Sequence, residues 1–587
     1  MAIISLKVLS LETILENLKL LAIQCLSNCI LLPVQISNEI FEYIHSRGVI
    51  LGGEEVVFFS SKVSSLTSIK LVEGQLINIQ NYDFLKNHQI ESVIYDFSDI
   101  KDFIFLIDPI CLKSLWIKNG LKSENSIKSA VNFIKKCENL QSLNLNCYDD
   151  GILIKNLFME TKFSDYSLKT LCLHSQTTEL YELYNDNLRE MLENCQNLSE
   201  IQINYNVWKQ IETICQGLQT SYSTLSSIDI EFNSFTNRQI IALANLLDNC
   251  RQLKVFRFNY QTNKNGENTT TKNDDILEID RILNGLANSC ENLQEISLII
   301  NDYTFKENDR NLINLLNNCR NLQTIQLSFK DVDIYSNLGK MAPFSKLNKV
   351  NVKCSNGEEL KYVGDFLSVC HHIQTIVIDI SFDVGRYLKG ICNSLTNSCR
   401  TLTNINLSGL LMANEHMQHF ADLVMNCNSL ESIELTLAEI GKEAEMIWNS
   451  LTPSKNNLTN LKLCVAFSIN TNDAKCLAQF LYCCRCLQKF ELLCNNVRET
   501  AIIEILNGLL PSCQTLKYLK IPLPFDRDHG FHLVNFVSRC KILQELNILG
   551  NKQLLSQANK FTNAIRNSCR KITRMEFFLL ESGLFSV

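Results

Sequence analysis

The sequence predicts an α/β solenoid, a right-handed coil of strand–helix units with parallel strands on its concave face and helices on its convex face. Three observations predict this fold. The pattern C-x-x-L-x-x-L-x-L recurs along the chain, as in Cys290–Leu298 and Cys319–Leu327. Successive copies are about 29 residues apart, and apolar residues at helical spacing lie between them. A fixed period of this length indicates stacked units that bury their apolar faces against each other.

Each unit is expected to contain one short strand and one helix. The Leu-x-Leu alternation has the period of two that is typical of a strand. Leu312, Leu315, Leu316 and Cys319 follow the spacing of one buried helix stripe. A strand, a crossover helix and a parallel strand form a right-handed coil. The first leucine of the pattern, or an isoleucine in its place, is found at 140, 168, 198, 225, 253, 293, 322, 347, 373, 402, 430, 458, 487, 516, 543 and 572.

Three less regular copies begin at 66, 90 and 112, so we expect a solenoid of about nineteen units over residues 61–587. One interval is longer than the others because residues 261–275 form a polar insertion without apolar residues. Such a segment is typical of a surface loop.

Residues 1–60 do not fit the repeat and predict a separate helical segment. Apolar spacing predicts one helix from Ser10 to Cys29. Pro33 is suited to the first turn of a second helix. One interpretation is a cap, which would cover the exposed apolar end of the solenoid.

Composition limits the function and the compartment. The chain has 587 residues, 46% hydrophobic and 20% charged, which is typical of a folded protein. Its net charge of −7 argues against a nucleic-acid partner. No apolar run is long enough to cross a membrane, and the N-terminal stretch does not resemble a secretory signal.

The 25 cysteines are expected to be reduced thiols, because twelve of them share one position of the repeat, where Cys behaves as a small buried apolar residue. This favours a cytoplasmic, or alternatively nuclear, protein. The twelve are Cys137, Cys195, Cys250, Cys290, Cys319, Cys370, Cys399, Cys427, Cys484, Cys513, Cys540 and Cys569.

The repeats resemble the ribonuclease-inhibitor-like class of leucine-rich repeats. The Cys before each strand is similar to the cysteine-containing variety found in F-box-type substrate receptors. Residues 32–44 also resemble the first helix of an F-box, L-P-x-E-I-L-x-x-I-F-x-Y-L, with Gln35 and Ser37 at the usual Glu and Leu positions. The F-box is incomplete, because its Trp-containing third helix is absent.

The same segment is similar to the cullin-contact pattern of von Hippel–Lindau-type boxes, apolar-Pro-x-x-apolar-x-x-x-apolar. In the elongin-binding helix expected upstream, Ser10 and Leu11 match but Leu15 replaces the usual Cys. These resemblances imply a Skp-type or elongin adaptor and a cullin as partners, and the interpretation as a plain cap stays open. The implied adaptor-binding residues are Leu32, Pro33, Ile36, Ile40, Phe41 and Ile44.

A protein target is expected to bind the concave face. The side chains between the last two apolar positions of a unit, and those two residues earlier, should point toward this face. From these rows we select Arg257, Gln326, Asn351, Asn406, Glu434, Lys462, Glu491, Tyr518, Lys520 and Arg574 as candidate contacts.

No motif for catalysis, phosphate binding or a metal is found. His416 and His419 lack an evident third ligand, and the cysteines at 476–494 contain only one C-x-x-C. We therefore expect no enzyme activity, no cofactor and no metal. The sequence favours non-enzymatic protein recognition, as the substrate-recognition subunit of a cullin-RING (SCF-like) ubiquitin ligase. The alternatives are a leucine-rich-repeat scaffold without a ligase role, or a GTPase regulator.

Overall fold

In the computed structural model, every strand begins two residues after the first leucine or isoleucine of a pattern, as β10 (Thr324–Phe329) does after Leu322. The chain divides into two units, Met1–Asn292 and Leu293–Val587, which are described separately. The structure describes residues 25, 27, 31–46, 59, 64–72, 85, 87–96, 107–118, 123–147, 153, 156–157, 167–175, 185–205, 211–232, 236–260, 279–300, 309–329, 337–341, 343–354, 357–380, 387–412, 417–437, 442–523, 529–550, 565, 572 and 574–579.

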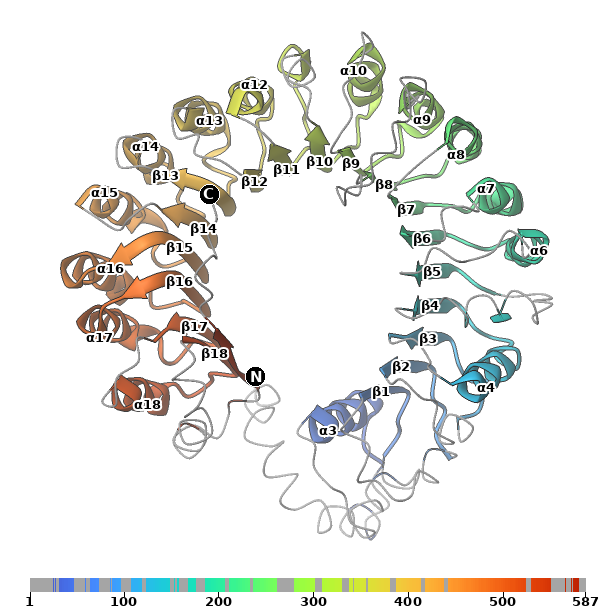
Figure 1. Ribbon diagram of the computed structural model, residues 1–587, viewed down its shortest axis with the longest axis horizontal. Helices are drawn as coiled ribbons and strands as arrows, with labels where there is room; N and C mark the ends of the chain where they lie inside the picture. The colour runs from blue at the N-terminus through green and yellow to red at the C-terminus, as the bar shows by residue number, and fades with distance from the viewer. Residues whose placement is uncertain are drawn as a thin grey trace, which may run out of the picture. The chain divides into compact units, whose positions relative to one another are not determined.

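The strands of the first unit pair in chain order as one parallel ladder. In Figure 1 they line the inner side of this unit, the first helix lies at the β1 end, and the other helices lie outside the strands. The strands are β1 (Ser68–Val72), β2 (Ser92–Asp96), β3 (Ser114–Ile117), β4 (Ser142–Cys147), β5 (Thr170–Ser175), β6 (Glu200–Tyr205), β7 (Ser227–Phe232) and β8 (Val255–Tyr260). The helices are α3 (Val34–Ser46), α4 (Glu124–Ile134), α6 (Asn185–Asn194), α7 (Ile211–Gly217), α8 (Asn237–Asn249) and α9 (Ile279–Gly285).

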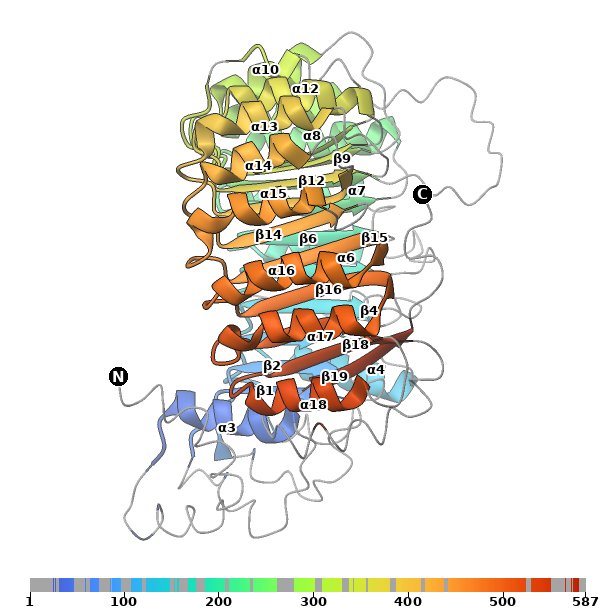
Figure 2. The ribbon, with the colours of Figure 1, turned by 90° about the vertical axis from the view of Figure 1, so that its left-hand side faces the viewer.

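The second unit repeats this arrangement, and Figure 2 shows its helices stacked over the strands. Its parallel strands are β9 (Glu295–Ile300), β10, β11 (Lys349–Cys354), β12 (Thr375–Ile380), β13 (Asn404–Met412), β14 (Ser432–Leu437), β15 (Asn460–Ile469), β16 (Lys489–Val497), β17 (Tyr518–Pro522), β18 (Glu545–Gly550) and β19 (Arg574–Leu579). Its helices are α10 (Asp309–Asn318), α12 (Gly357–Ser368), α13 (Leu388–Leu395), α14 (Met417–Met425), α15 (Lys442–Ser450), α16 (Thr471–Cys483), α17 (Glu499–Gly508) and α18 (His529–Arg539).

The core lies between the strands and the helices of each unit. In β10, Ile325 and Leu327 are fully buried, and Leu312 of α10 is fully buried opposite them. The side chain between the two strand residues, Gln326, is only partly buried because it points to the other face of the sheet. The predicted fold class is confirmed as an α/β solenoid of leucine-rich-repeat type.

Before β2–β8 and β10–β18, two consecutive backbone N–H groups share one carbonyl of the preceding repeat. Gln141 and Ser142, for example, both donate to the Lys113 carbonyl, at 2.7 and 2.9 Å. This link fixes the register between neighbouring strands, because it places the same position of successive repeats side by side.

The helices end in two alternating ways. In the first, the α-helix leads directly into Cys, and the Cys195 thiol donates to the Met191 carbonyl at 3.3 Å. In the second, a 3₁₀ turn follows the α-helix, and a buried serine in that turn reaches back to the preceding repeat. Ser398 donates to the Cys370 carbonyl at 3.0 Å. The equivalent contacts are Ser221 to Cys195, Ser289 to Cys250, Ser454 to Cys427 and Ser512 to Cys484.

Glycines let helices of the second kind pack closely against the preceding helix of the first kind. A Cβ at Gly285 of α9 would lie 2.5 Å from the Ala244 carbonyl oxygen of α8. A Cβ at Gly508 of α17 would lie 2.6 Å from that of Ala478 in α16. Any side chain at these positions would separate the two helices, so the repeats are built as tightly packed pairs.

Replacing Ser398 by Ala should destabilise the second unit by about 1–3 kcal/mol, because it leaves the buried Cys370 carbonyl and Ile373 N–H without their partner. Urea unfolding followed by circular dichroism measures the change. Ser538→Ala is the matched control, since Ser538 is exposed. Equal midpoints for the two variants would contradict the structural role of the serine.

The cysteines at the end of first-kind helices should react very slowly with alkylating reagents. Burial raises the pKa of Cys137, Cys195, Cys250, Cys370 and Cys484 to about 12, so almost no thiolate is present near neutral pH. Iodoacetamide labelling of the native protein at pH 7.5, read by mass spectrometry, is expected to modify the exposed Cys483 and Cys486 first. Labelling of the five buried thiols at the same rate would show that the helix ends open readily.

Several predicted features lie outside the described residues: most of the helix from Ser10 to Cys29, the insertion at 261–275, His416 and Cys569. None of the described helices combines the length and the apolar character needed to span a membrane.

Candidate functional site

Helix α3 packs one face on the start of the first ladder. Ser37, Ile40 and Phe41 are buried, with 0, 2 and 2% of their surface exposed. The Phe41 ring meets that of Phe59 edge to face, with 5.4 Å between centroids. This face therefore belongs to the core of the first unit.

Asn38 connects α3 to β1 in the way that one repeat connects to the next. Its Oδ1 accepts from the N–H groups of Thr67 and Ser68, at 3.0 and 3.3 Å. Its Nδ2 donates to the Thr67 hydroxyl at 3.1 Å. In the next repeat, the equivalent pair, Glu91 and Ser92, donates to the Thr67 carbonyl. The side-chain oxygen of Asn38 thus takes the place of the carbonyl of a preceding repeat.

The first turn of α3 and the residues before it expose apolar side chains, whereas the side of the helix opposite the buried face carries Gln35, Glu39 and Glu42. Leu31 is 55% exposed, and Val34 and Ile36 are each 41% exposed. Pro33 is exposed and Leu32 is partly buried. Exposed apolar groups this close together are typical of a contact surface. We call Leu31, Val34 and Ile36 the α3 patch.

The predicted adaptor-binding set is only partly available to a partner. The structure corrects the assignment of Ile40 and Phe41, because both are buried in the protein's own core. Leu32, Pro33 and Ile36 remain on or near the surface, and the side chain of Ile44 lies outside the described part. Helical spacing alone could not separate these two groups, because Ile36 and Ile40 lie one turn apart on the same side of α3.

His88 links the segments around Phe59 and Leu66, and it should make the stability of this part of the first unit depend on pH. Its Nδ1 accepts from the Leu66 N–H at 3.1 Å, and its Nε2 contacts the Phe59 carbonyl at 2.5 Å. Burial lowers the pKa of His88, and the Phe59 contact offsets this only in part. A lowered folded-state pKa stabilises the fold above the unfolded-state pKa near 6.5, and this stabilisation is lost as the pH falls below it.

We therefore expect hydrogen exchange around Leu66 to slow less between pH 7 and pH 5 than the intrinsic exchange rate does, which leaves an excess of exchange at the lower pH. His88→Gln can keep both contacts without titrating and should remove the excess. His532→Gln is the control at an exposed helix position. An excess that persists in His88→Gln would assign the pH dependence to another group.

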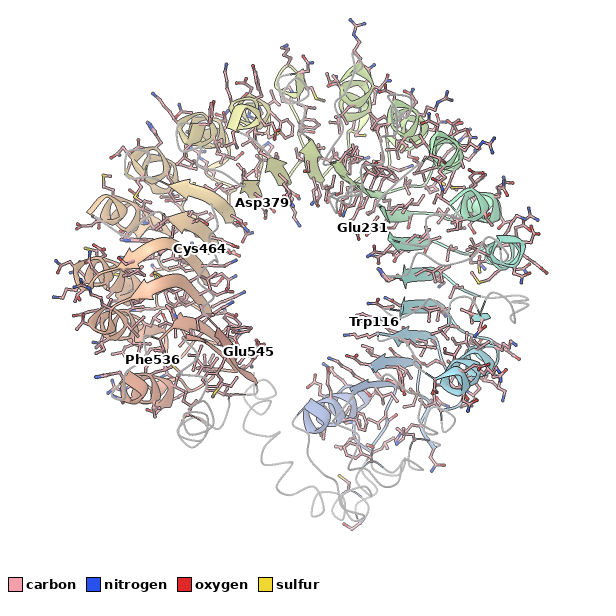
Figure 3. All side chains as sticks on the ribbon, viewed as in Figure 1. Trp116, Glu231, Asp379, Cys464, Phe536 and Glu545 are labelled. Atoms are coloured by element: carbon pink, nitrogen blue, oxygen red, sulfur yellow. The ribbon has the colours of Figure 1, made fainter. Side chains whose placement is uncertain are left out.

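The inner face of the first unit carries an aromatic residue that sequence reasoning missed. Trp116 lies between the buried Leu115 and Ile117 and pairs in register with Asn144 of β4. The Lys118 ammonium lies 4.3 Å from the centroid of its ring. Figure 3 shows Trp116 on the inner side of the strands. The position of Trp116 between two apolar strand residues was the signal that could have identified it.

Further along the same face, the predicted contact Arg257 pairs with a neighbouring acid. Its guanidinium lies 3.4 Å from the Asp229 carboxylate on the adjacent strand. Glu231, also on this side in Figure 3, accepts from the Asn259 amide at 2.9 Å. These residues belong to the first unit, whereas the other nine predicted contacts belong to the second.

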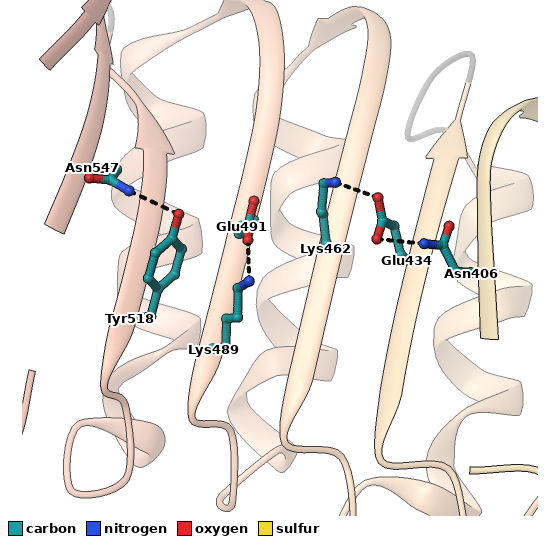
Figure 4. A network of polar contacts seen from close by, with 7 residues as sticks. All are labelled: Asn406, Glu434, Lys462, Lys489, Glu491, Tyr518 and Asn547. Atoms are coloured by element: carbon teal, nitrogen blue, oxygen red, sulfur yellow. Dashed lines mark hydrogen bonds and ion pairs between the residues drawn. The ribbon is translucent and has the colours of Figure 1, made fainter. Parts of the chain in front are cut away.

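Seven polar residues of the inner face of the second unit form the contacts in Figure 4. Asn406 donates to one Glu434 carboxylate oxygen at 2.9 Å, and Lys462 binds the other. These three residues occupy the same position of β13, β14 and β15, so the register brings them together.

The contacts continue on the next strands. Lys489 pairs with Glu491 across 2.7 Å, and its ammonium lies 4.8 Å from the centroid of the Tyr518 ring. The Asn547 amide donates to the Tyr518 hydroxyl at 2.9 Å. The polar side chains therefore hold one another in place, which reduces the entropy lost when a partner binds.

The remaining predicted contacts are placed as follows. Gln326 and Asn351 are partly buried neighbours on β10 and β11. The Lys520 ammonium lies 5.1 Å from the centroid of the Phe578 ring. Arg574 opens β19, and its side chain lies outside the described part. Glu491 is more deeply placed than expected, with 7% of its surface exposed.

The chemistry of these surfaces is that of polar recognition. In the part of the chain that the structure describes, no three His, Cys, Asp or Glu side chains are grouped to hold a metal ion. Burial alone would lower the pKa of Lys462, but the hydrogen bond and charge of Glu434 outweigh this effect and raise it. Lys462 is therefore a cation throughout the physiological pH range.

Comparison with known proteins adds little. No protein-family model and no curated protein matches the sequence. One solved structure, described as the crystal structure of a Rad7 and Elc1 complex in yeast, is similar with 13% identity and a TM-score of 0.31. The match covers 79% of this chain and 87% of that chain. A likeness of this size carries no argument about function.

Proposed function

We propose that this protein is a non-enzymatic recognition subunit, acting as the substrate receptor of a cullin-RING ubiquitin ligase. In this proposal the α3 patch binds a small adaptor of the Skp or elongin type, which joins the chain to a cullin. The inner faces of the strands bind the target protein. Cytoplasm or nucleus is the compartment that reduced thiols favour.

The observation that carries the proposal is the exposed apolar surface at the first turn of α3. Its inner side is used for packing on β1, yet Leu31, Val34 and Ile36 leave apolar surface exposed. A helix that only capped the solenoid would be expected to be polar wherever it meets solvent, and the first turn of α3 departs from this. The resemblance of residues 32–44 to adaptor-binding boxes names the kind of partner.

The second candidate is a scaffold without a ligase role, and Asn38 favours it. Because Asn38 reproduces the link between repeats, capping alone explains why α3 is present. The two candidates differ in whether the α3 patch has a partner.

The test mixes the full-length chain with a purified Skp-type adaptor or with elongin C and measures binding by isothermal titration calorimetry. The proposal expects wild type to bind one adaptor and the Val34→Asp, Ile36→Asp double variant to bind at least about tenfold more weakly. Ile110→Asp is the matched control, because Ile110 is 56% exposed and lies away from α3. If folded wild type binds neither adaptor, the ligase role is refuted and the scaffold remains.

A further inference from the structure

Three lysines of the inner face lie on β15, β16 and β17 around the position of Glu491. Lys489 lies two residues earlier on the same strand and contacts Glu491 at 2.7 Å. Lys462 of β15 and Lys520 of β17 pair in register with Glu491 from either side. We call Lys462, Lys489 and Lys520 the lysine cluster.

The cluster places positive charge outermost. The side chains of Lys462 and Lys489 are 32 and 47% exposed, whereas those of Glu434 and Glu491 are 21 and 9% exposed. Lys462 and Lys489 are each bound to one of the two carboxylates, and the Lys520 ammonium lies against the Phe578 ring, so the three lysines and two glutamates have a net charge of one positive unit. Since the carboxylates lie deeper, an approaching partner meets the lysines first.

Aromatic rings and neighbouring strands define the limits of this surface. Lys489 lies against Tyr518, and Lys520 lies against Phe578, which is 38% exposed. On β14 the neighbouring inner positions are the neutral Ser432 and the acidic Glu434, which Lys462 binds. On the other side Glu545 and Glu576 follow on β18 and β19. An anionic group is therefore favoured only over β15–β17, with apolar surface beside it.

We propose that the lysine cluster binds an acidic segment of a partner protein through its Asp or Glu side chains, with an adjacent apolar side chain against Phe578. The inference rests on the proposed function only in taking this inner face as a recognition surface, and it specifies that the bound segment is acidic. The supporting argument is charge complementarity between the lysines and the carboxylates of the partner.

The chemistry favours carboxylate over phosphate. Phosphate groups are preferentially recognised by the planar fork of arginine, and the three cations here are lysines. Glu434 and Glu491 leave the cluster with only a small net positive charge. The attraction of an anion rises in proportion to its charge, whereas its desolvation cost rises with the square of the charge, so a singly charged carboxylate is favoured over a dianion.

The test measures fluorescence polarisation of labelled decapeptides on the full-length protein without any adaptor. The probe alternates Glu and Leu, and the comparison peptides carry Gln or phosphoserine at the Glu positions. Lys520→Gln is the primary variant. The Lys520 ammonium contacts the Phe578 ring, and its removal deprives none of the described carboxylates of an ion-pair partner. The second variant replaces all three lysines by Gln, with circular dichroism confirming that it is folded.

The proposal expects the Glu peptide to bind about fivefold more weakly to Lys520→Gln and about twentyfold more weakly to the triple variant. Lys349→Gln is the matched control, because Lys349 is an exposed inner-face lysine on β11 that lies outside the cluster. Binding should also weaken with added salt.

Equal affinity for the Gln peptide, or an equal loss in Lys349→Gln, would overturn the assignment to the cluster. Tighter binding of the phosphoserine peptide would overturn the choice of carboxylate. The assay contains no adaptor, so failure of the ligase proposal and failure of this inference give different results.

Discussion

Replacing Ile40 by Asp is expected to destabilise the first unit by about 3–5 kcal/mol, as for other unpaired charges buried in a protein core. Ile40 is 2% exposed and lies on the face of α3 that packs on β1. The aspartate would lose the apolar contact and would find no cation nearby on that face, whose other buried members are Ser37 and Phe41. We expect α3 to detach and the N–H groups of Thr67 and Ser68 to lose Asn38.

Urea unfolding and limited proteolysis measure this effect, and Ile36→Asp is the matched control on the same helix. Ile36 is 41% exposed, so its aspartate stays in water and should change stability by no more than about 0.5 kcal/mol. Equal destabilisation by both variants would mean that Ile36 is buried as deeply as Ile40, contrary to the structure.

This contrast also decides how adaptor binding can be tested. Loss of binding in Ile40→Asp would follow from unfolding of α3, whether or not an adaptor contacts that residue. Variants of the α3 patch separate the two effects, because Val34 and Ile36 are exposed in the folded chain. For this reason the adaptor experiment uses those residues.

The repeats were predictable because their signal is local and is repeated many times. A Leu-x-Leu alternation allows one register, so each strand start and the residues of the inner face follow from the position of one leucine. The pairing of Lys462 with Glu434 also follows, since equal positions of neighbouring repeats lie side by side.

Features that depend on contacts between distant residues were not predictable in this way. Asn38 is an ordinary helix residue in the sequence, and its role appears only once Thr67 lies beside it. The burial of Ile40 but not Ile36, one turn earlier on the same side, depends on which turn of α3 packs on β1. The alternating helix ends were predictable only in part. A serine before the shared Cys position marks every second repeat in the sequence, as at Ser398 and Ser512. Its hydrogen bond to the preceding repeat is visible only in the folded structure.

Leu322→Ala is expected to destabilise the second unit by about 2–5 kcal/mol, the range for a buried leucine truncated in a core. Leu322 is 1% exposed and stands at the first leucine position, two residues before β10. Its equivalents in the adjoining repeats, Leu293 and Leu347, are fully buried. The truncation leaves a cavity in a stack where each repeat is supported only by its neighbours, so the loss should spread along the second unit.

Hydrogen exchange read by mass spectrometry resolves where the loss falls. We expect β9, β10 and β11 to exchange faster in Leu322→Ala than in wild type, with a smaller change at β17 and β18. Gln323→Ala is the control, because Gln323 is the next residue and is exposed. Uniform acceleration over the second unit would mean that it unfolds as one cooperative body, and no acceleration at β10 would show that the leucine register is wrong.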